Sequence, residues 1–600
     1  MSPGLSNAIF SSMDNKKISN ILQEIGDILE IRGENKFRVN AYHNASMSIL
    51  SYPKDLRDIV DENPKLLEKI PAIGATMRQY IDELVSTGAC REFETIRKSI
   101  PHGLLDMLRI RGVGPKKVKL FYTELQIKDL EGLKQAAKDG LLAELPRMGE
   151  KSQKEILEAL DEHSKFELER VMISDALMEA EKYIEYMKKC KEVKRIEYAG
   201  SLRRRKETIG DVDLLVTTAG DHGETGTDAE KIMKHFTKYK EVMKILAEGA
   251  TKSAVILGSG IQVDLRVVED EVFGAAMHYF TGSKTHNIKL RDMAKKKGLK
   301  VSEYGVFKRG SGKGKEAGIP IACKTEEAVF KAVGLPYIIP ELRKGEDEIE
   351  YAKKNKKMPT FIEFEDLKGD LHVHTNWSDG KSSLDDVAKT YEKAGFKYVA
   401  ICDHSSIMGI TGGLNSKKIQ NQWEQIDKLN KKMKSLKILK GSEVDILKDG
   451  SLDFPDEILG KLDVVVIAAH IYGRLPERQQ MKRMIAAIEN PYANILAHPS
   501  GRMINRRGSI NIDMVKIIDA CKVNNVALEI NSNPLRLDLT DKYVRIAKDK
   551  GVKIVINSDG HHSSRWELLK YGVFVARRGW LTKSDVLNTQ NSDQLSKFWE

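Results

Sequence analysis

Side chains that can bind metal ions recur through about the last 230 residues, each near the end of a predicted strand. Packing alone does not explain them, because buried ionisable groups need partners. A pair such as HVH is usually incidental, but a series at successive strand ends predicts a multinuclear metal centre. Imidazoles mixed with carboxylates suit Mn²⁺, Zn²⁺ or Fe²⁺ better than Mg²⁺. The predicted ligands are His372, His374, Asp379, His404, Glu443, His470, His498, Asp559 and His561.

A second group of carboxylates lies upstream. Asp211 and Asp213 are two apart in a predicted strand and so face the same way, and Asp264 lies in a strand that we expect alongside. Three carboxylates on one face repel one another unless cations bind between them, and oxygen ligands suit Mg²⁺. A DxD pair alone is more often an exposed turn. The preceding GSLRRRK at 200–206 could hold a triphosphate, so the combination predicts phosphoryl or nucleotidyl transfer at two metal ions.

Three short segments resemble one another in the first part of the chain. IPAIGATM (70–77), IRGVGPKKV (110–118) and LPRMGEKSQ (145–153) each combine apolar residues, a glycine turn and a helix start. Glycine lets the backbone approach a phosphate, towards which the N–H groups of the following helix point. One such turn is usually an ordinary helix connection; three predict binding to a duplex backbone without sequence reading. The residues concerned are Gly74, Gly112, Gly114, Lys116, Lys117 and Gly149.

The spacing of apolar residues predicts how these groups are positioned. Residues 18–100 have helical spacing, whereas strand-like segments alternate with turns between residues 195 and 268. Beyond residue 364, seven strands alternate with helices, as in LDDVAKTYEKAG after GDLHVH. This repeat predicts a parallel sheet, closed or nearly closed as a barrel, whose chemistry lies at the carboxyl ends of the strands.

Composition describes a multidomain globular protein with an anionic partner. The 600 residues are 41% hydrophobic and 31% charged, and the net charge of +11 suits nucleic acid. The five cysteines lack CxxC spacing, which fits a reducing, cytoplasmic setting. No apolar run approaches the roughly 20 residues needed to span a bilayer, so no membrane partner is expected.

Several motifs in residues 14–340 resemble the family X DNA polymerases, of which DNA polymerase beta is a small member. They are NAYHNAS, the three hairpins, GSLRRRKETIGDVD, QVDLRV and HYFTGSKTHNIKLR. The likeness is to the longer bacterial and archaeal type. It implies a small helical DNA-binding domain (14–100), a fingers-type helix-hairpin-helix domain (101–168), an α+β nucleotidyltransferase palm (169–268) and a thumb that binds the nascent base pair (269–340). The next segment (341–365) is highly charged and poor in apolar residues, which predicts a charged linker or a solvated helix before a C-terminal domain (366–600).

The resemblance also implies roles for single residues. Asp211, Asp213 and Asp264 match the catalytic, metal-binding carboxylates, which hold two Mg²⁺ or Mn²⁺ ions, with Asp264 placed to help deprotonate or orient the primer 3′ hydroxyl. Tyr42 matches a DNA-contacting position. Plain core packing is the alternative for the YF pair in YFTGS. The positions implied for nucleotide binding are Gly200, Ser201, Arg204, Arg170, Tyr279, Phe280, Gly282, Asn287 and Arg291.

One position departs from the family pattern. Members with deoxyribose-phosphate lyase activity use a lysine amine in a helix after the first hairpin to form an imine. This chain has Tyr80 there and Thr76 one turn earlier, and nearby Arg78 does not replace the amine. A lyase by that route is therefore not expected.

The strand-end ligands resemble the polymerase-and-histidinol-phosphatase superfamily, called PHP domains, and match all nine ligand positions of its three-ion centre. With the polymerase motifs, this implies a distorted (β/α)7-type barrel, a 3′ to 5′ exonuclease with apurinic-site endonuclease or 3′-phosphatase action, and base excision repair. Gapped or nicked DNA and deoxynucleoside triphosphates are the expected partners of a monomer. Hydrolysis of small phosphomonoesters and a purely structural PHP domain are the alternatives.

Three further features near the strand ends leave alternatives open. Glu529 and Asn531 are expected either to support the ligands or to be structural. Arg502, with Arg506 and Arg507, either grips a DNA backbone or is solvated. His562 is expected at the surface.

Overall fold

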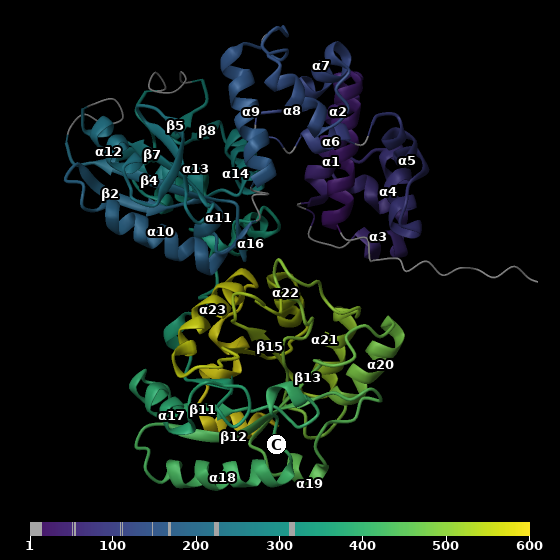
Figure 1. Cartoon of the computed structure of the whole chain (residues 1–600), viewed down its shortest axis with the longest axis vertical. Helices are drawn as coiled ribbons and strands as arrows, with labels where there is room; N and C mark the ends of the chain where they lie inside the picture. Colours follow the sequence, from purple (N-terminus) through teal and green to yellow (C-terminus); the bar gives the residue numbers. More distant parts are fainter. Residues whose placement is uncertain are drawn as a thin grey trace, which may run out of the picture. The chain divides into compact units, whose positions relative to one another are not determined.

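The computed structural model describes residues 15–50, 52, 56–101, 103–108, 110, 112–146, 148–165, 170–220, 227–310 and 318–599. The chain forms two compact units, each described by itself. Unit 1 comprises Met1–Glu169, Ser283–Met293 and Lys344–Glu350, and unit 2 comprises Arg170–Gly282, Ala294–Arg343 and Tyr351–Glu600. Figure 1 shows the elements in sequence colours.

Up to residue 165, the described part of unit 1 is helical, as its apolar spacing predicts. Leu22, Ile25, Phe93 and Phe121 are fully buried in one continuous core. Glycines precede three of the helices: Gly74 caps α4, Gly114 caps α7, and α9 begins directly after Gly149. The helices are α1 (Asn15–Arg32), α2 (Lys36–Leu50), α3 (Leu56–Glu62), η1 (Pro64–Lys69), α4 (Ala75–Thr87), α5 (Arg91–Lys98), α6 (Gly103–Met107), α7 (Pro115–Leu125), α8 (Leu130–Lys138) and α9 (Glu150–Lys165).

Unit 2 begins with a five-stranded sheet of order β2-β4-β7-β6-β5, and α10 and α12 pack against its strands. Its strand β5 lies at the sheet edge and is half exposed, so its VMKILAE segment does not read clearly as a strand in the sequence. The elements are β1 (Val171–Met172), α10 (Ile173–Met187), β2 (Val193–Tyr198), α11 (Gly200–Arg203), β3 (Thr208–Ile209), β4 (Asp211–Thr218), α12 (Thr227–Thr237), β5 (Val242–Glu248), β6 (Lys252–Leu257) and β7 (Gln262–Val268).

The segment predicted as a charged linker is partly buried. Glu341, Arg343 and Glu348 are 8%, 0% and 1% exposed, because each has a charged or polar partner that offsets its desolvation. High charge therefore does not make this segment solvated throughout. The elements from residue 270 to 355 are η3 (Asp270–Val272), α13 (Phe273–Thr281), α14 (Lys284–Lys296), β8 (Leu299–Ser302), β9 (Gly305–Lys308), α15 (Glu326–Val333), η5 (Pro340–Leu342) and α16 (Glu348–Asn355).

The remaining residues of unit 2 form the predicted parallel barrel, with its seven strands in sequence order. Val373 bridges Gly560, so the first and last strands nearly close the sheet. The strands are β10 (Gly369–Val373), β11 (Tyr398–Ile401), β12 (Lys437–Asp445), β13 (Val464–Ala468), β14 (Ile495–Leu496), β15 (Ala527–Asn531) and β16 (Ile554–Asn557).

Helices lie outside these strands (Figure 1). The main ones are α17 (Leu384–Lys393), α18 (Ser416–Asn430), α19 (Asp456–Leu459), α20 (Glu477–Ile488), α21 (Met514–Val523), α22 (Asp541–Asp549), η8 (Ser563–Leu568), α23 (Leu569–Arg578) and α24 (Ser592–Trp599). Among the residues given a structure, no helix is long and apolar enough to cross a membrane.

Candidate functional site

The three upstream aspartates come together on adjacent strands of the five-stranded sheet. Strands β4 and β7 pair in parallel with Asp213 opposite Asp264, and Asp211 lies two residues before Asp213. Burial, together with the negative charges of Asp211 and Asp264, raises the pKa of Asp213 to about 7. This adjacency confirms the predicted geometry. Such a cluster is fully ionised at neutral pH only when cations share it, which fits divalent metal ions.

Gly200 brings the start of α11 against this cluster. A Cβ atom at Gly200 would lie 2.0 Å from Oδ2 of Asp213, and the residue has a φ of +58°. Only glycine suits both the close approach and the left-handed backbone. The hydroxyl of the next residue, Ser201, is buried and has no hydrogen-bond partner among the described residues, so it is available to a bound molecule.

A Gly200→Ala variant is expected to lower primer extension by about 100-fold, because displacement of Asp213 by roughly an ångström misplaces the reacting groups. Steady-state extension of a primed template measures the loss. Gly258→Ala is the matched control, since the nearest atom to a Cβ there lies 3.9 Å away. Equal activity of the two variants would contradict the role given to the Gly200 turn.

Arg203, three residues after Gly200, is held by the buried carboxylate of Glu326. Glu326 accepts from Arg203 Nη2 at 2.6 Å and pairs with Arg343 Nη1 at 2.5 Å. Burial opposes ionisation of Glu326, but Arg343 and Arg203 outweigh it and lower its pKa to about 2. Arg203 Nη1 also donates to Thr281 Oγ1 at 2.7 Å. Glu326 therefore ties helix α11 to α15.

Replacing Glu326 by glutamine is expected to cost about 3 kcal/mol of unfolding free energy, because it leaves the buried guanidinium of Arg343 and the half-buried one of Arg203 without this charged partner. Chemical denaturation measures this, with exposed Glu327→Gln as control. Since the folded pKa lies below the ordinary 4.5, the stabilisation is present above about pH 4.5 and is lost as the pH falls towards 2. The Glu326→Gln variant should lack this one contribution, so its stability should fall less than that of the wild type between pH 4.5 and 2.

Three other residues predicted to bind the nucleotide are Arg204, Arg170 and Gly282. Burial and nearby Arg578 lower the pKa of Arg204 to about 10, and Arg204 Nη1 donates to the carbonyl of Thr281. Arg170 Nη2 donates to the carbonyl of Thr208 at 2.6 Å. Gly282 follows α13 with a φ of +69°.

The aromatic pair lies on α13 beside strand β7. The rings of Tyr279 and Phe280 meet edge to face at 5.1 Å, and the guanidinium of Arg266 lies 4.6 Å over Phe280. Both rings are partly buried, which is compatible with packing or with a sugar contact. Asn287 and Arg291 lie one turn apart in α14, where Arg291 Nε donates to the Asn287 carbonyl. The predicted positions of Asn287 and Arg291 near the nascent base pair and the template stay predictions.

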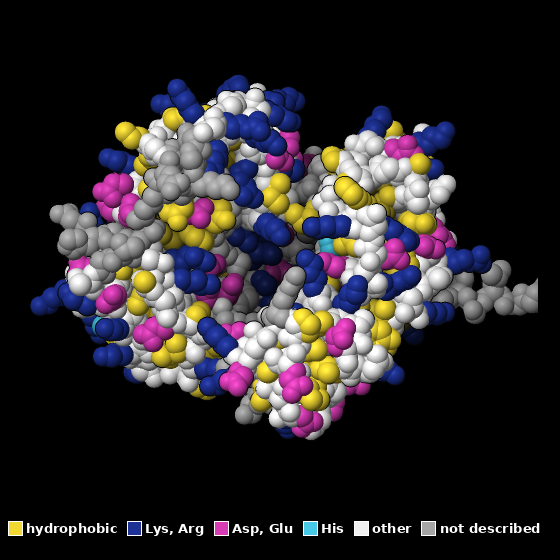
Figure 2. Space-filling view, turned by 90° about the horizontal axis from the view of Figure 1, so that it is seen from above, with side chains coloured by type: hydrophobic (Ala, Val, Ile, Leu, Met, Phe, Trp, Pro, Cys, Tyr) yellow, Lys and Arg dark blue, Asp and Glu magenta, His cyan; other side chains and the backbone are white. Residues whose placement is uncertain are grey.

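No neighbouring atom crowds the four hairpin glycines. A Cβ at Gly74, Gly112, Gly114 or Gly149 would meet nothing within 4 Å, and Gly112 has a φ of +78°. Lys116 is exposed and Lys117 is half-buried in the first turn of α7. Figure 2 shows Lys and Arg side chains spread over one face of the molecule between acidic groups.

Two tyrosines of unit 1 pack on one phenylalanine. Tyr42 is 4% exposed and meets Phe93 at 6.0 Å between ring centroids, so its ring belongs to the core. Tyr80 meets the same ring at 5.3 Å. A direct DNA contact by Tyr42 stays a prediction.

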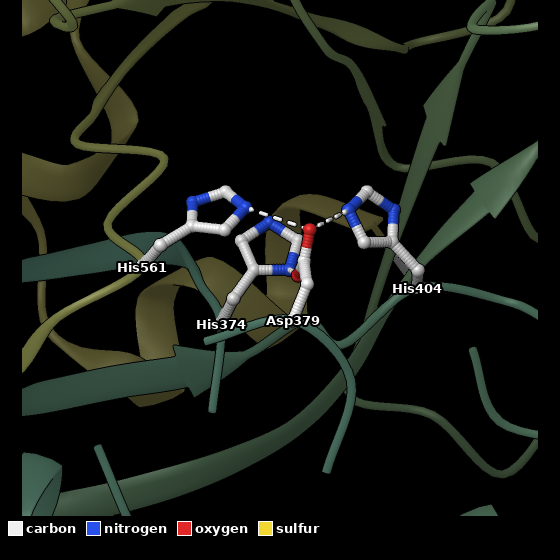
Figure 3. Close-up of side chains that lie close together, drawn as sticks. All are labelled: His374, Asp379, His404 and His561. Carbon is white, nitrogen blue, oxygen red and sulfur yellow. Dashed lines mark ion pairs between the residues drawn. The ribbon is translucent and has the colours of Figure 1, made fainter. Parts of the chain in front are cut away.

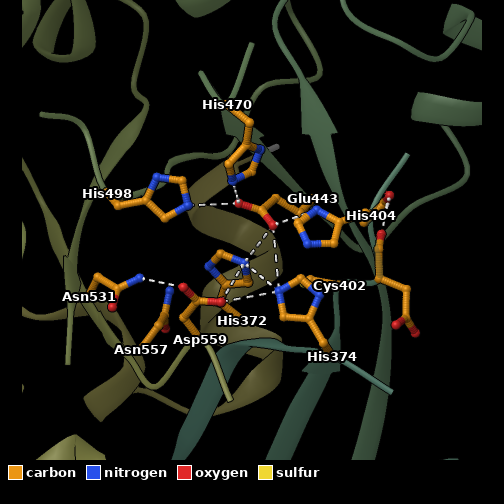
Figure 4. Close-up of polar contacts among 12 residues, drawn as sticks. His372, His374, Cys402, His404, Glu443, His470, His498, Asn531, Asn557 and Asp559 are labelled. Atoms are coloured by element: carbon orange, nitrogen blue, oxygen red, sulfur yellow. Dashed lines mark hydrogen bonds and ion pairs between the residues drawn. The ribbon is translucent and has the colours of Figure 1, made fainter. Parts of the chain in front are cut away.

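The predicted ligands of the barrel lie at the carboxyl ends of its strands. Figure 4 shows Glu443 among His372, His374, His404, His470, His498 and Asp559. Glu443 Oε1 lies 2.9 Å from His498 Nε2 and 3.3 Å from His470 Nε2. Its Oε2 lies 3.0 Å from His404 Nδ1 and 3.5 Å from His374 Nε2. Burial opposes ionisation of this carboxyl, but the surrounding histidines hold its pKa well below the usual range.

A second carboxylate, Asp379, lies between His561 and His404 (Figure 3). Its Oδ2 is 3.3 Å from His561 Nε2 and 3.6 Å from His404 Nε2. Burial opposes a high pKa for His561, but Asp379 and Asp559 raise that pKa to about 9. His374 stacks on His561 at 4.3 Å between ring centroids.

The donor set fits metal ions rather than a hydrogen-bonded cluster. Nε2 of His372 and Nε2 of His374 lie only 3.2 Å apart, and His374 Nδ1 is buried and makes no hydrogen bond with the described residues. Three groups of ligand atoms each lie within 4.8 Å of one another. They are His374, Asp379, His404 and His561; His372, His374 and Asp559; and His404, Glu443 and His470.

Buried carboxylates orient these ligands. Glu529 Oε1 lies 2.8 Å from His372 Nδ1, which favours the supporting role among its two predicted alternatives, and Asn531 Nδ2 donates to Asp559 at 2.9 Å. Two further groups were not predicted. Asp445 lies 3.2 Å from His470 Nδ1, and Asp403 accepts from Thr375 Oγ1 at 2.6 Å in the loop before Asp379. Asp445 and Asp403 lie at strand ends, and this position is the feature of the sequence from which they could have been predicted.

The remaining predictions around the barrel have clear outcomes. Arg502 Nη2 donates to Glu207 at 2.6 Å and to the carbonyl of Leu537, so this arginine joins the sheet region to the barrel and is not a free DNA-gripping group. Arg507 Nη2 donates to the carbonyl of Gly501 at 2.8 Å. His562 is exposed, as expected.

Family models match four parts of the chain. They are described as a helix-hairpin-helix domain (13–90), a SAM-like helix-hairpin-helix tandem (104–162), a DNA polymerase beta thumb (276–344) and a PHP domain (370–502). The matches fall on the hairpins, on the segment after the sheet and on the barrel, in the order that the motifs predict.

Three curated relatives illustrate the similarity. The chain is 35% identical to the DNA polymerase/3′-5′ exonuclease PolX of Bacillus subtilis over 98% of this chain and 99% of that protein. It is 25% identical to rat DNA polymerase lambda over 55% of this chain and 56% of that one. A probable phosphatase of a Thermoanaerobacter species is 31% identical over 37% of this chain and 89% of its own length.

Proposed function

This chain belongs to the PolX-type family X DNA polymerases that carry a PHP domain, and from that premise we propose that it fills gaps in DNA and trims 3′ ends during base excision repair. The observation that carries the proposal is that one chain holds both a three-aspartate cluster and a set of nine strand-end ligands, eight in candidate metal groups and His498 beside Glu443. The first suits synthesis of phosphodiesters and the second their hydrolysis. The proposal includes a cytoplasmic monomer acting on gapped or nicked duplexes.

For synthesis, Asp211, Asp213 and Asp264 would hold two Mg²⁺ or Mn²⁺ ions, which supply positive charge for the phosphates of the incoming deoxynucleoside triphosphate. Asp264 orients the primer 3′ hydroxyl. The amides of Gly200 and Ser201 and the Ser201 hydroxyl bind the triphosphate, beside the guanidinium of Arg204. Tyr279 and Phe280 crowd the sugar, and the hairpin glycines hold the duplex backbone.

For trimming, the nine barrel ligands would hold up to three Mn²⁺, Zn²⁺ or Fe²⁺ ions, which supply Lewis acidity at the scissile phosphate. Glu443 lies within 3.5 Å of five histidine rings and so helps to fix their positions. Glu529 and Asp445 hold His372 and His470 by their second ring nitrogens, which leaves the Nε2 atoms free to act as ligands. Apurinic-site endonuclease and 3′-phosphatase action would use the same centre.

A second candidate function follows from the probable phosphatase relative, whose match covers 37% of this chain and 89% of its own length. On that alternative the PHP domain hydrolyses a small phosphomonoester and is only fused to the polymerase. In the test, the whole protein is incubated with Mn²⁺ and one of two substrates. These are a gapped duplex that carries a mispaired 3′ end and p-nitrophenyl phosphate. We expect removal of the mispair followed by gap filling. Rapid monoester hydrolysis without removal of the mispair would favour the alternative, and absence of both synthesis and hydrolysis would leave a DNA-binding scaffold.

A further inference from the structure

A cleft of about 620 Å³ lies beside the barrel centre, and its two walls come from different halves of unit 2. Two of the nine predicted ligands, Asp559 and His561, line it, so it opens onto the metal centre. The opposite wall is helix α10 of the five-stranded sheet region, which contributes Leu177 and Met178. The barrel centre is therefore not walled by the barrel alone.

A hydrogen bond and an ion pair join the sheet region to the barrel near this cleft. Asn505 Nδ2 donates to the carbonyl of Arg170 at 2.7 Å, just before α10, and Arg502 pairs with Glu207 at 2.6 Å. Burial raises the pKa of Tyr571 on the barrel side, and the charges of Glu181 and Asp175 on α10 raise it further. Several separate contacts therefore place α10 beside the barrel.

The walls differ in chemistry. The α10 wall exposes 48% of Met178, together with the carboxylates of Asp175 and Glu181. The barrel wall carries the cations of Arg565 and Lys570 and the apolar Leu535. A phosphate is attracted to the barrel wall and repelled by the carboxylates opposite. An aromatic ring gains by packing on a thioether such as Met178.

We propose that α10 of the polymerase half completes the substrate site of the PHP centre and that Met178 packs on the base of the 3′-terminal nucleotide being removed. The scissile phosphate lies at Asp559 and His561, with the strand on its 5′ side along Arg565 and Lys570. A volume in the range of small-ligand sites holds about a nucleotide of single strand, and not a duplex whose major groove alone is about 12 Å wide. This inference rests on the proposed exonuclease function.

The test uses the full-length protein and two single-stranded oligonucleotides that differ only at the 3′ end, which carries either thymidine or an abasic tetrahydrofuran residue. Met178→Ala is expected to lower kcat/KM for the thymidine end by about 5- to 20-fold, the range of one base-stacking contact. Removal of the abasic end should be unchanged. Met243→Ala is the matched control, since Met243 is a 56% exposed methionine of β5 and does not line this cleft.

The outcomes separate this inference from the function on which it rests. Wild-type protein that removes neither end would overturn the proposed exonuclease and the inference with it. Normal trimming by wild type with no effect of Met178→Ala overturns the inference alone. An equal loss on both ends would also overturn it, because a contact with the base cannot affect an end that has none. Gap filling by Met178→Ala should match wild type, which verifies the fold.

Discussion

Replacing Asp213 by asparagine is expected to abolish primer extension while removal of 3′ nucleotides continues. Asp213 lies opposite Asp264 on the paired strands and has a pKa of about 7, raised first by burial and then by Asp211 and Asp264. Divalent ions offset this repulsion, so the ionised carboxylate is favoured when metal is bound. An amide removes the charge and weakens the metal site. A fall in the extension rate of at least about 1000-fold, or some 4 kcal/mol, is expected.

The measurement is single-turnover extension on a gapped duplex, with trimming of a single strand assayed in the same preparation. Asp228→Asn is the matched control, since Asp228 lies on α12 and pairs with Lys231 away from the cluster. Extension that survives in Asp213→Asn would remove the two-ion proposal. Loss of trimming in the same variant would instead indicate that the substitution unfolds unit 2.

Much of this site could be predicted because strand residues alternate and strand ends converge. Asp211 and Asp213, two apart, had to share a face, and the parallel register then brought Asp264 beside them. The barrel ligands followed in the same way, since parallel strands present their carboxyl ends on one side. In both cases a short-range pattern determined a long-range contact.

Other features depend on tertiary partners that no local pattern encodes. Arg502 looked like a free basic loop residue, yet it pairs with Glu207, which is 295 positions earlier in the chain. The charges at Arg343 and Glu348 suggested a solvated linker, but Glu326 and His286 allow their burial. The cleft beside α10 was equally hidden, because its walls are far apart in sequence. These contacts are visible only after folding.

The second large effect is expected at Glu443, where glutamine should abolish trimming and bound metal together while extension continues. The Glu443 carboxylate lies within 3.5 Å of five histidine side chains, His372, His374, His404, His470 and His498. An amide cannot supply the negative charge that offsets bound cations in this buried site. We expect a loss of trimming of at least about 100-fold, since even groups behind the ligands affect metal sites by 10- to 100-fold.

Metal content of the purified protein, measured by inductively coupled plasma mass spectrometry, gives a readout independent of activity. Glu457→Gln is the matched control, because Glu457 is an exposed carboxylate on α19 of the same barrel. If Glu443→Gln lost trimming but kept its full metal content, Glu443 would act on the substrate and not as a ligand. If it kept both, the centre would not be the site of trimming. Because Glu443 and the Asp211–Asp213 pair belong to separate sheets, extension should be unaffected in either case, and its loss would mean that the barrel supports the polymerase fold.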